Sequence, residues 1–255
     1  MFHKSRKLKT INYFLGLIVF VILGCSNDDE NIKPVISIND NDGANYNPII
    51  EPKNFVDEIS NPYLNLIPGK VWIYEGINDD GENERIEFEV TALHKEILGV
   101  PITVVHDKVW VENEIVEDTK DFYAQDKEGN VWYFGEEIDN YEKGVLVNHD
   151  GSWEAGRNEA KPGIFLKANP NAGDVYRQEF LQDSAEDLEE VLGVSETIET
   201  AFGTFENCIK TMNWSPLDPE IIEVKFYSKE VGGMVYETKI SGEEGYLELV
   251  EVKNP

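Results

Sequence analysis

Side chains able to do chemistry gather in the stretch 135–168, which joins two β-rich parts of the chain. His149 stands beside an aspartate, and a histidine oriented by a carboxylate can act as a general base. Paired acids of this stretch could also hydrolyse glycosides, the candidates being Glu136, Glu137, Asp139 and Glu154. The chain holds 50 acidic residues, so such pairs arise by chance and we assign no catalytic residue. We predict ligand contacts instead, at Tyr141, His149, Trp153 and Glu154, with packing at the junction as the alternative for Trp153.

Motifs for common catalytic and metal sites do not occur in the sequence. There is no Gly-x-Ser-x-Gly, His-Glu-x-x-His or P-loop spacing. Only two cysteines are present, which excludes a disulfide scaffold and a cysteine-based metal site. Calcium is the one metal to consider, because the turns at 40–43 and 78–82 carry carboxylate and amide oxygens. Neither turn has the full EF-hand register, so we expect ordinary polar turns and no cofactor.

The N-terminus carries the pattern of an exported protein. Basic residues within 4–9 precede an apolar run at 11–23, which ends in Ile22-Leu23-Gly24-Cys25. This pattern predicts a secretory signal peptide over 1–24, with an uncleaved anchor or a buried helix as the alternative. A small residue followed by cysteine resembles the lipobox of bacterial lipoproteins. The resemblance implies cleavage before Cys25 and attachment of acyl chains such as palmitate, which would hold the protein on a membrane.

The residues after Cys25 predict where that anchor is displayed. The run Ser26-Asn27-Asp28-Asp29-Glu30 resembles the surface-export signal of lipoproteins in Bacteroidetes-type bacteria. It implies an outer-membrane protein facing the cell surface, and a plain hydrophilic spacer is the alternative. Asn, Asp, Pro and Ser dominate 25–60, so we predict a disordered acidic linker there. The formal charge of −28 argues against nucleic-acid partners, because such a surface repels phosphates.

The soluble body contains an apparent internal duplication at an offset of 104 residues. The matched positions are glycines and large apolar residues, the types that set turns and cores. They include Gly69 and Gly173, Val90 and Val194, Gly99 and Gly203, Trp110 and Trp214, and Phe122-Tyr123 and Phe226-Tyr227. We therefore divide the body into a first β unit (61–134), a connecting segment (135–168) and a second β unit (169–255). Chance similarity between two β-rich stretches is the alternative.

Each unit has the sequence pattern of an antiparallel meander. Residues 85–90 alternate polar and apolar side chains, as half-buried strands do, and Lys127-Glu128-Gly129-Asn130 has the composition of a hairpin turn. The run 184–192 carries a helix-start signature, but the duplication favours a loop followed by a strand from about Glu189. We expect an all-β body, built as a sandwich, an open barrel or one continuous curved sheet.

Several stretches resemble the recurrent sequence words of a family of bacterial secreted proteins and lipoproteins. They are PGKVWIYEG (68–76), YAQD (123–126), NVWYFGE (130–136), GSWEAG (151–156), AKPGI (160–164), GDVYRQE (173–179) and GTFENC (203–208). The resemblance covers roughly 61–237 and implies the fold unit and the compartment, but it supplies no catalytic residues. The chain departs from the family pattern at 231–235.

Two functional hypotheses follow from the sequence. The first is a noncatalytic, membrane-anchored surface lipoprotein that binds a protein or glycan partner or serves the envelope. The alternative is a secreted hydrolase of glycans or peptides that uses carboxylates of the connecting segment. A cleft with two close carboxylates, one strongly desolvated, would favour the hydrolase, whereas the absence of a sizeable pocket would favour a purely structural protein.

Overall fold

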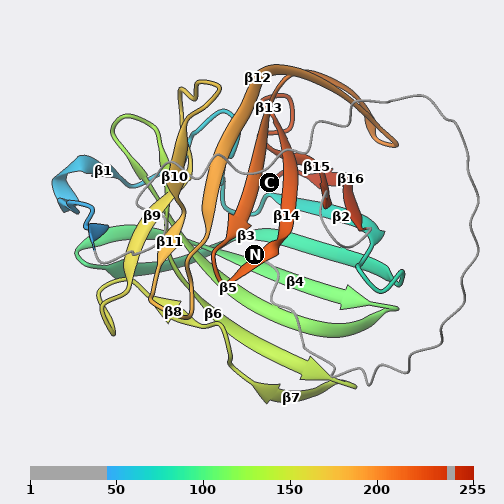
Figure 1. Cartoon of the computed structure of the whole chain (residues 1–255), viewed down its shortest axis with the longest axis horizontal. Coiled ribbons are helices and arrows are strands. Elements are labelled where there is room, and N and C mark those ends of the chain that lie inside the picture. The colour runs from blue at the N-terminus through green and yellow to red at the C-terminus, as the bar shows by residue number, and fades with distance from the viewer. Residues whose placement is uncertain (1–44, 240–244) are drawn as a thin grey trace, which may run out of the picture. The chain divides into compact units, whose positions relative to one another are not determined.

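The computed structural model describes residues 45–239 and 245–255, which form a nearly closed, barrel-like antiparallel sheet (Figure 1). The predicted signal peptide, Cys25 and the linker before residue 45 lie outside the described residues. None of the helices in the described part is long and apolar enough to cross a membrane. A turn of 3-10 helix, η2, spans Pro52–Asn54. The strands are β1 (Phe55–Val56), β2 (Val71–Ile77), β3 (Asn83–Ile97), β4 (Val100–Val111), β5 (Glu114–Asp126), β6 (Val131–Glu142), β7 (Val145–Asn148), β8 (Trp153–Glu154), β9 (Lys161–Leu166), β10 (Val175–Arg177), β11 (Glu179–Phe180), β12 (Leu188–Thr200), β13 (Gly203–Ser215), β14 (Asp218–Ser228), β15 (Gly233–Lys239) and β16 (Tyr246–Lys253).

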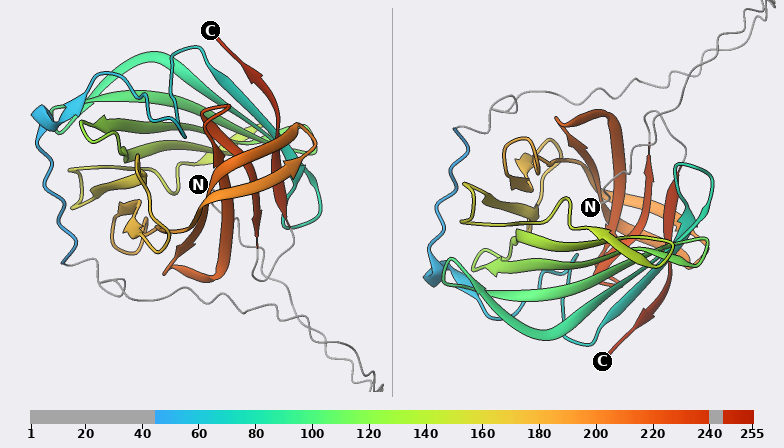
Figure 2. Two further views of the ribbon diagram at one scale, coloured as in Figure 1. Left: turned by 90° about the horizontal axis from the view of Figure 1, so that it is seen from above. Right: turned by 90° about the horizontal axis from the view of Figure 1, so that it is seen from below.

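The strand order confirms an all-β meander. Neighbours along the sheet run β10-β12-β13-β14-β15-β16-β2-β3-β4-β5-β6-β9-β11, and β1, β7 and β8 pair off this path. The strands curl around a shared interior when seen from above and below (Figure 2). Of the three architectures expected from the sequence, the curved and nearly closed sheet is the one observed.

The sheet nearly closes through one short segment, 175–180. β10 pairs with β12 at one edge of the sheet, where Tyr176 lies opposite Glu189. β11 follows at once in the chain and pairs with β9 at the other edge, where Glu179 lies opposite Pro162. Gln178, between the two strands, donates its backbone N–H to the carbonyl of Asp187 at 2.9 Å. This six-residue segment therefore connects the two edges of the sheet, with β10 at one edge and β11 at the other.

The alternation of side chains along β5 shows how polar the interior is. Glu117, Thr119 and Asp121 are buried and face inward, whereas the residues between them, Asp118 and Lys120, face outward. Successive residues of a strand point to opposite faces of the sheet, so the inward row is set by the pairing. The interior of this barrel thus carries charged side chains as well as apolar ones.

Residues 45–60 pack against the barrel, so the compact part of the chain begins before residue 61. Phe55 of β1 stacks edge-to-face on Trp132 and Phe134, and its side chain is buried. Ile59 is buried as well. The composition of this stretch predicted a disordered linker up to residue 60, but two apolar side chains are enough to fix its last part on the sheet.

The segment 184–192 and Cys208 both have the structure expected from the sequence. The helix-start signature at 184–192 yields a short turn followed by β12, which begins at Leu188, as the duplication suggested. Cys208 lies in β13 and is fully buried, and this burial raises the pKa of its thiol to about 11. A buried thiol with a high pKa is a packing residue, not a nucleophile.

One pair of backbone hydrogen bonds recurs at two glycines that the offset of 104 matches, Gly69 and Gly173, but the spacing to the bonded residue differs. Gly69 N–H donates to the Val90 carbonyl at 2.8 Å, and Val90 N–H donates to Lys70. The same pair of bonds recurs in the second series, where Gly173 N–H donates to Val191 and Val191 N–H to Asp174. By these bonds Val90 corresponds to Val191, not to the Val194 that an ungapped match predicts.

Candidate functional site

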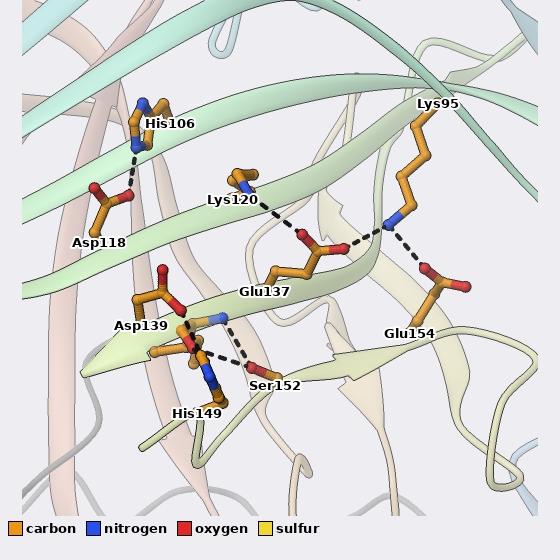
Figure 3. Close-up of polar contacts among 10 residues, drawn as sticks. Lys95, His106, Asp118, Lys120, Glu137, Asp139, His149, Ser152 and Glu154 are labelled. Atoms are coloured by element: carbon orange, nitrogen blue, oxygen red, sulfur yellow. Dashed lines mark hydrogen bonds and ion pairs between the residues drawn. The ribbon is translucent and has the colours of Figure 1, made fainter. Parts of the chain in front are cut away.

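The outer face of β4, β5 and β6 carries a network of paired charges (Figure 3). Residues of these strands that face outward meet side chains from β3 and from the segment after β6. Lys95 Nζ lies 3.2 Å from Glu137 Oε1 and 2.8 Å from Glu154 Oε2. Arg157 Nε lies 2.8 Å from Glu154 Oε1, and Lys120 Nζ lies 3.4 Å from Glu137 Oε2. Each carboxylate in this group therefore has a cation on both oxygens.

Two histidine–aspartate pairs flank that network. His106 Nε2 contacts Asp118 Oδ1, and His149 Nδ1 lies 2.7 Å from Asp139 Oδ1. The hollow between them has a volume of about 280 Å³. Its lining residues are Asp118, Lys120, Glu137, Ile138, Asp139, His149 and Ser152. The hollow is thus polar and shallow, and side chains exposed to water provide its charges.

The hydroxyl nearest to a histidine in this hollow is already engaged. Ser152 Oγ accepts the backbone N–H of Ile138 at 2.8 Å and lies 3.4 Å from the carbonyl oxygen of the same residue. His149 Nδ1 lies 3.0 Å from that carbonyl as well. A nucleophile needs its base within hydrogen-bonding reach, whereas Ser152 and His149 are both hydrogen-bonded to the backbone of Ile138.

The structure does not bring the four predicted ligand-contact residues together. His149 and Glu154 lie on the outer face, whereas Tyr141 lies in the β6–β7 hairpin opposite Leu146 and does not line the hollow. Trp153 is buried and faces the interior, with its ring centroid 5.6 Å from that of Tyr133. Trp153 and Glu154 are neighbours in β8, so they point to opposite faces of the sheet. The packing alternative therefore describes the position of Trp153.

The interior holds a second group of chemically capable residues, of which the sequence analysis had named only Glu136. Asp121 of β5 lies directly across from Glu136 of β6, and Glu136 lies across from Trp153 of β8. Tyr133 Oη lies 2.6 Å from Asp121 Oδ1 and 3.1 Å from Glu136 Oε2. One hydroxyl proton cannot serve both carboxylates, so a proton on one of the acids completes this bridge.

We name four inward-facing acids the interior carboxyl cluster: Asp107, Asp121, Glu136 and Glu179. Burial raises the pKa of Asp121 to about 6, and it raises the pKa of the other three well above their usual values. Repulsion between acids adds to the rise in pKa, since Asp121 acts on Glu136, and Asp187 and then Glu136 act on Glu179. Desolvation and like charges both favour the neutral form of a carboxyl.

The other half of the interior has a group with its own cation. Lys225 Nζ lies 3.0 Å from Glu223 Oε2 and 3.7 Å from Glu237 Oε2, and all three side chains are largely buried. Burial alone would lower the pKa of Lys225, but the two carboxylates raise it well above its usual value. Burial raises the pKa of Glu237 to about 7. We call these three residues the lysine-bridged group.

Comparisons with known proteins give structural neighbours only. No protein-family model matches the chain, and no curated protein matches it. A solved structure from Bacteroides fragilis, described as an exported protein with a YmcC-like fold, superposes with a TM-score of 0.44 at 13% identity. A structure from Parabacteroides distasonis, described as a lipoprotein, superposes with a TM-score of 0.41 at 17% identity. Each alignment covers 75% of this chain and 98% of the other.

Proposed function

We propose that the protein is a noncatalytic binding lipoprotein, anchored in the outer membrane through Cys25 and displayed at the cell surface. The sequence supports the anchor, because a signal-peptide pattern ends in Gly24-Cys25 and is followed by the acidic run 26–30. Several acyl chains together bind a bilayer stably, at about 0.8 kcal/mol for each buried CH₂. The barrel would then be the part that meets a partner outside the cell.

One observation carries the noncatalytic assignment: the charges of the outer face are paired with one another around a shallow hollow. Glu154, one of the four acids that the hydrolase hypothesis names, forms ion pairs with Lys95 and Arg157. A glycosidase needs two carboxyl groups about 5 to 10 Å apart with one kept protonated. On this face burial would raise the pKa of Glu137, but hydrogen bonds from Lys95 and Lys120 lower it, which favours the charged form. Exposed charges around a hollow instead offer hydrogen bonds and complementary charge to a polar protein or glycan partner.

We also propose that the two strand series descend from one duplicated unit. The repeated bonds at Gly69–Val90 and Gly173–Val191 support this origin, because both pairs fix the start of a strand in the same way. Small gaps then explain why one fixed offset does not describe the whole length. The connecting segment 135–168, which matches neither unit, supplies much of the outer hollow.

Fractionation of cells that express the protein tests the anchor. The parent chain should sediment with outer membranes, and Cys25→Ser should move it to the soluble fraction. Added protease should degrade the parent protein on intact cells while a periplasmic marker stays whole. Membrane retention of Cys25→Ser would refute lipid anchoring, and protection from protease would refute surface display.

A further inference from the structure

The interior carboxyl cluster contains buried groups that lack a well-aligned hydrogen bond. No well-aligned hydrogen bond reaches either oxygen of Glu179, which is fully buried. Burial raises the pKa of this carboxyl well above its usual value, and a contact with the backbone N–H of Asp187 opposes part of that rise. Oδ1 of Asp107 and the indole N–H of Trp153 likewise lack a hydrogen-bonding partner. Buried polar groups in native proteins are nearly always hydrogen-bonded, and buried charges are paired. Orphaned groups on three strands, β4, β8 and β11, indicate that a partner from outside the chain completes them.

The second half of the barrel has a buried cation, Lys225, at a position where the first half has an aspartate. Asp121 lies opposite Val105 in the β4–β5 pair, and Lys225 lies opposite Thr211 in the β13–β14 pair. Lys225 stands 104 residues after Asp121, and in these two strands the offset is kept, because Phe122 and Phe226 follow them. An aspartate thus occupies the position at which the other unit places its buried cation.

No ion pair within the described residues includes a member of the interior carboxyl cluster. The described part of the chain also contains no group of acids, histidines and cysteines arranged to hold a metal ion. In the lysine-bridged group, Lys225 Nζ forms ion pairs with both carboxylates. By comparison, the interior carboxyl cluster has acceptors in excess and no ammonium group.

Aromatic rings pack around Tyr133, whose hydroxyl contacts Asp121 and Glu136. The ring centroid of Tyr133 lies 5.1 Å from that of Tyr123, 5.6 Å from Trp153 and 5.9 Å from Phe165. Carboxylates beside aromatic faces form the environment that binds organic ammonium ions, since the ring face and the carboxylate both attract positive charge. The unpaired indole N–H of Trp153 adds a donor for an oxygen atom on the same ligand.

We propose that the interior carboxyl cluster binds the ammonium group of a small organic amine that also carries an oxygen acceptor. Asp121, Glu136 and Glu179 accept hydrogen bonds from the ammonium group, and the Trp153 N–H donates to the oxygen. The bound ammonium occupies the role that Lys225 has in the other half of the barrel. This site lies inside the sheet and is independent of the anchor and of the outer face.

Ethanolamine is the simplest probe with both groups, and ethylene glycol is its neutral counterpart. The full chain is purified in a neutral detergent and a phosphate buffer at pH 8, so that no other amine competes. Calorimetric titration and thermal unfolding are measured with ethanolamine, ethylene glycol and potassium chloride. We expect saturable binding and a higher Tm with ethanolamine only.

Variants connect that effect to the cluster. Glu179→Gln keeps the shape of the side chain and removes its charge, so ethanolamine affinity should fall at least about tenfold. Asp121→Asn should do the same, and it replaces the first variant if that one does not fold. Glu128→Gln removes an exposed glutamate from the β5–β6 turn and should leave the affinity unchanged.

Three results would overturn the proposal. The first is a lack of saturable ethanolamine binding, which would mean that protons alone complete the cluster. The second is an equal response to ethylene glycol or potassium. The third is unchanged affinity in folded Glu179→Gln or Asp121→Asn.

Discussion

Removal of the buried lysine from the lysine-bridged group gives the sharpest test of how the interior is held together. Lys225→Met keeps the length of the side chain and deletes its charge. At an effective dielectric constant near 20, the attraction is about 5.5 kcal/mol to Glu223 at 3.0 Å and about 4.5 kcal/mol to Glu237 at 3.7 Å. Desolvation of the lysine offsets part of this attraction. The expected loss at pH 8 is about 3 to 5 kcal/mol, the cost of leaving buried carboxylates without their cation.

The pH dependence of that loss distinguishes charge from packing. Burial raises the pKa of Glu237 to about 7, so this acid takes up a proton between pH 8 and pH 5. A neutral carboxyl needs no cation, and the destabilisation by Lys225→Met should therefore shrink at pH 5. Urea unfolding followed by tryptophan fluorescence measures the free energy of unfolding at both values. Lys127→Met, at an exposed turn position, is the control and should change it by less than about 0.5 kcal/mol.

Two results would refute this reasoning. One is a loss below about 1 kcal/mol at pH 8, which would mean that the carboxylates do not depend on the lysine. The other is the same loss at pH 5 and pH 8, which would assign the effect to packing of the side chain. The double variant Lys225→Met with Glu237→Gln should recover part of the stability, because it removes one of the stranded charges.

Two further predictions concern the other ionisable groups. Burial raises the pKa of Glu189 and of Glu237 to about 7, so the folded chain holds more protons than the unfolded chain between about pH 4.5 and pH 7. The free energy of unfolding should therefore fall by about 2 kcal/mol or more as the pH rises from 5 to 8. Thermal unfolding at constant ionic strength measures this change, and a Tm that is flat or rising over this range would contradict the raised pKa values. Glu154→Gln breaks partly exposed ion pairs and should cost no more than about 1 kcal/mol of unfolding free energy. Neither the parent chain nor this variant should hydrolyse 4-nitrophenyl glycosides; turnover by the parent that Glu154→Gln abolishes would restore the hydrolase hypothesis.

The meander was predictable because its signals are local. Alternating side chains at 85–90 and the glycine turn at 127–130 specify strands and a hairpin from neighbouring residues alone. The start of β12 near Glu189 was predictable for another reason: comparison with the first unit outweighed a helix-start signature. The buried position of Cys208 follows from its apolar, strand-like surroundings.

The interior acids were not predictable from the same signals. In β5 the residues Glu117 to Asp121 are polar on both faces, so alternation cannot say which face is inside. The inward row is fixed only when β4 and β6 pair on either side. A hydrophobic pattern would have specified that register directly, but here contacts distant in sequence decide it.

The positions of the candidate side chains within the connecting segment could not be predicted from their sequence spacing. Trp153 and Glu154 are adjacent in sequence, and a loop could have turned both toward one ligand. β8 is instead a short strand paired with Gly135 and Glu136 of β6, which separates the two side chains by the thickness of the sheet. Recognition of 153–154 as a strand would have placed Trp153 beside Glu136.

The pairing of β16 with β2 has a consequence for how fast and when the barrel can form. Val71 of β2 lies opposite Lys253 of β16, almost at the end of the chain. Contacts between residues so far apart in sequence make folding slow, because the loop between them must be ordered before the contact stabilises anything. A chain that emerges N-terminus first therefore holds β2 without this partner until β16 has followed it. Until then one edge of β2 stays unpaired, and the sheet cannot close on that side.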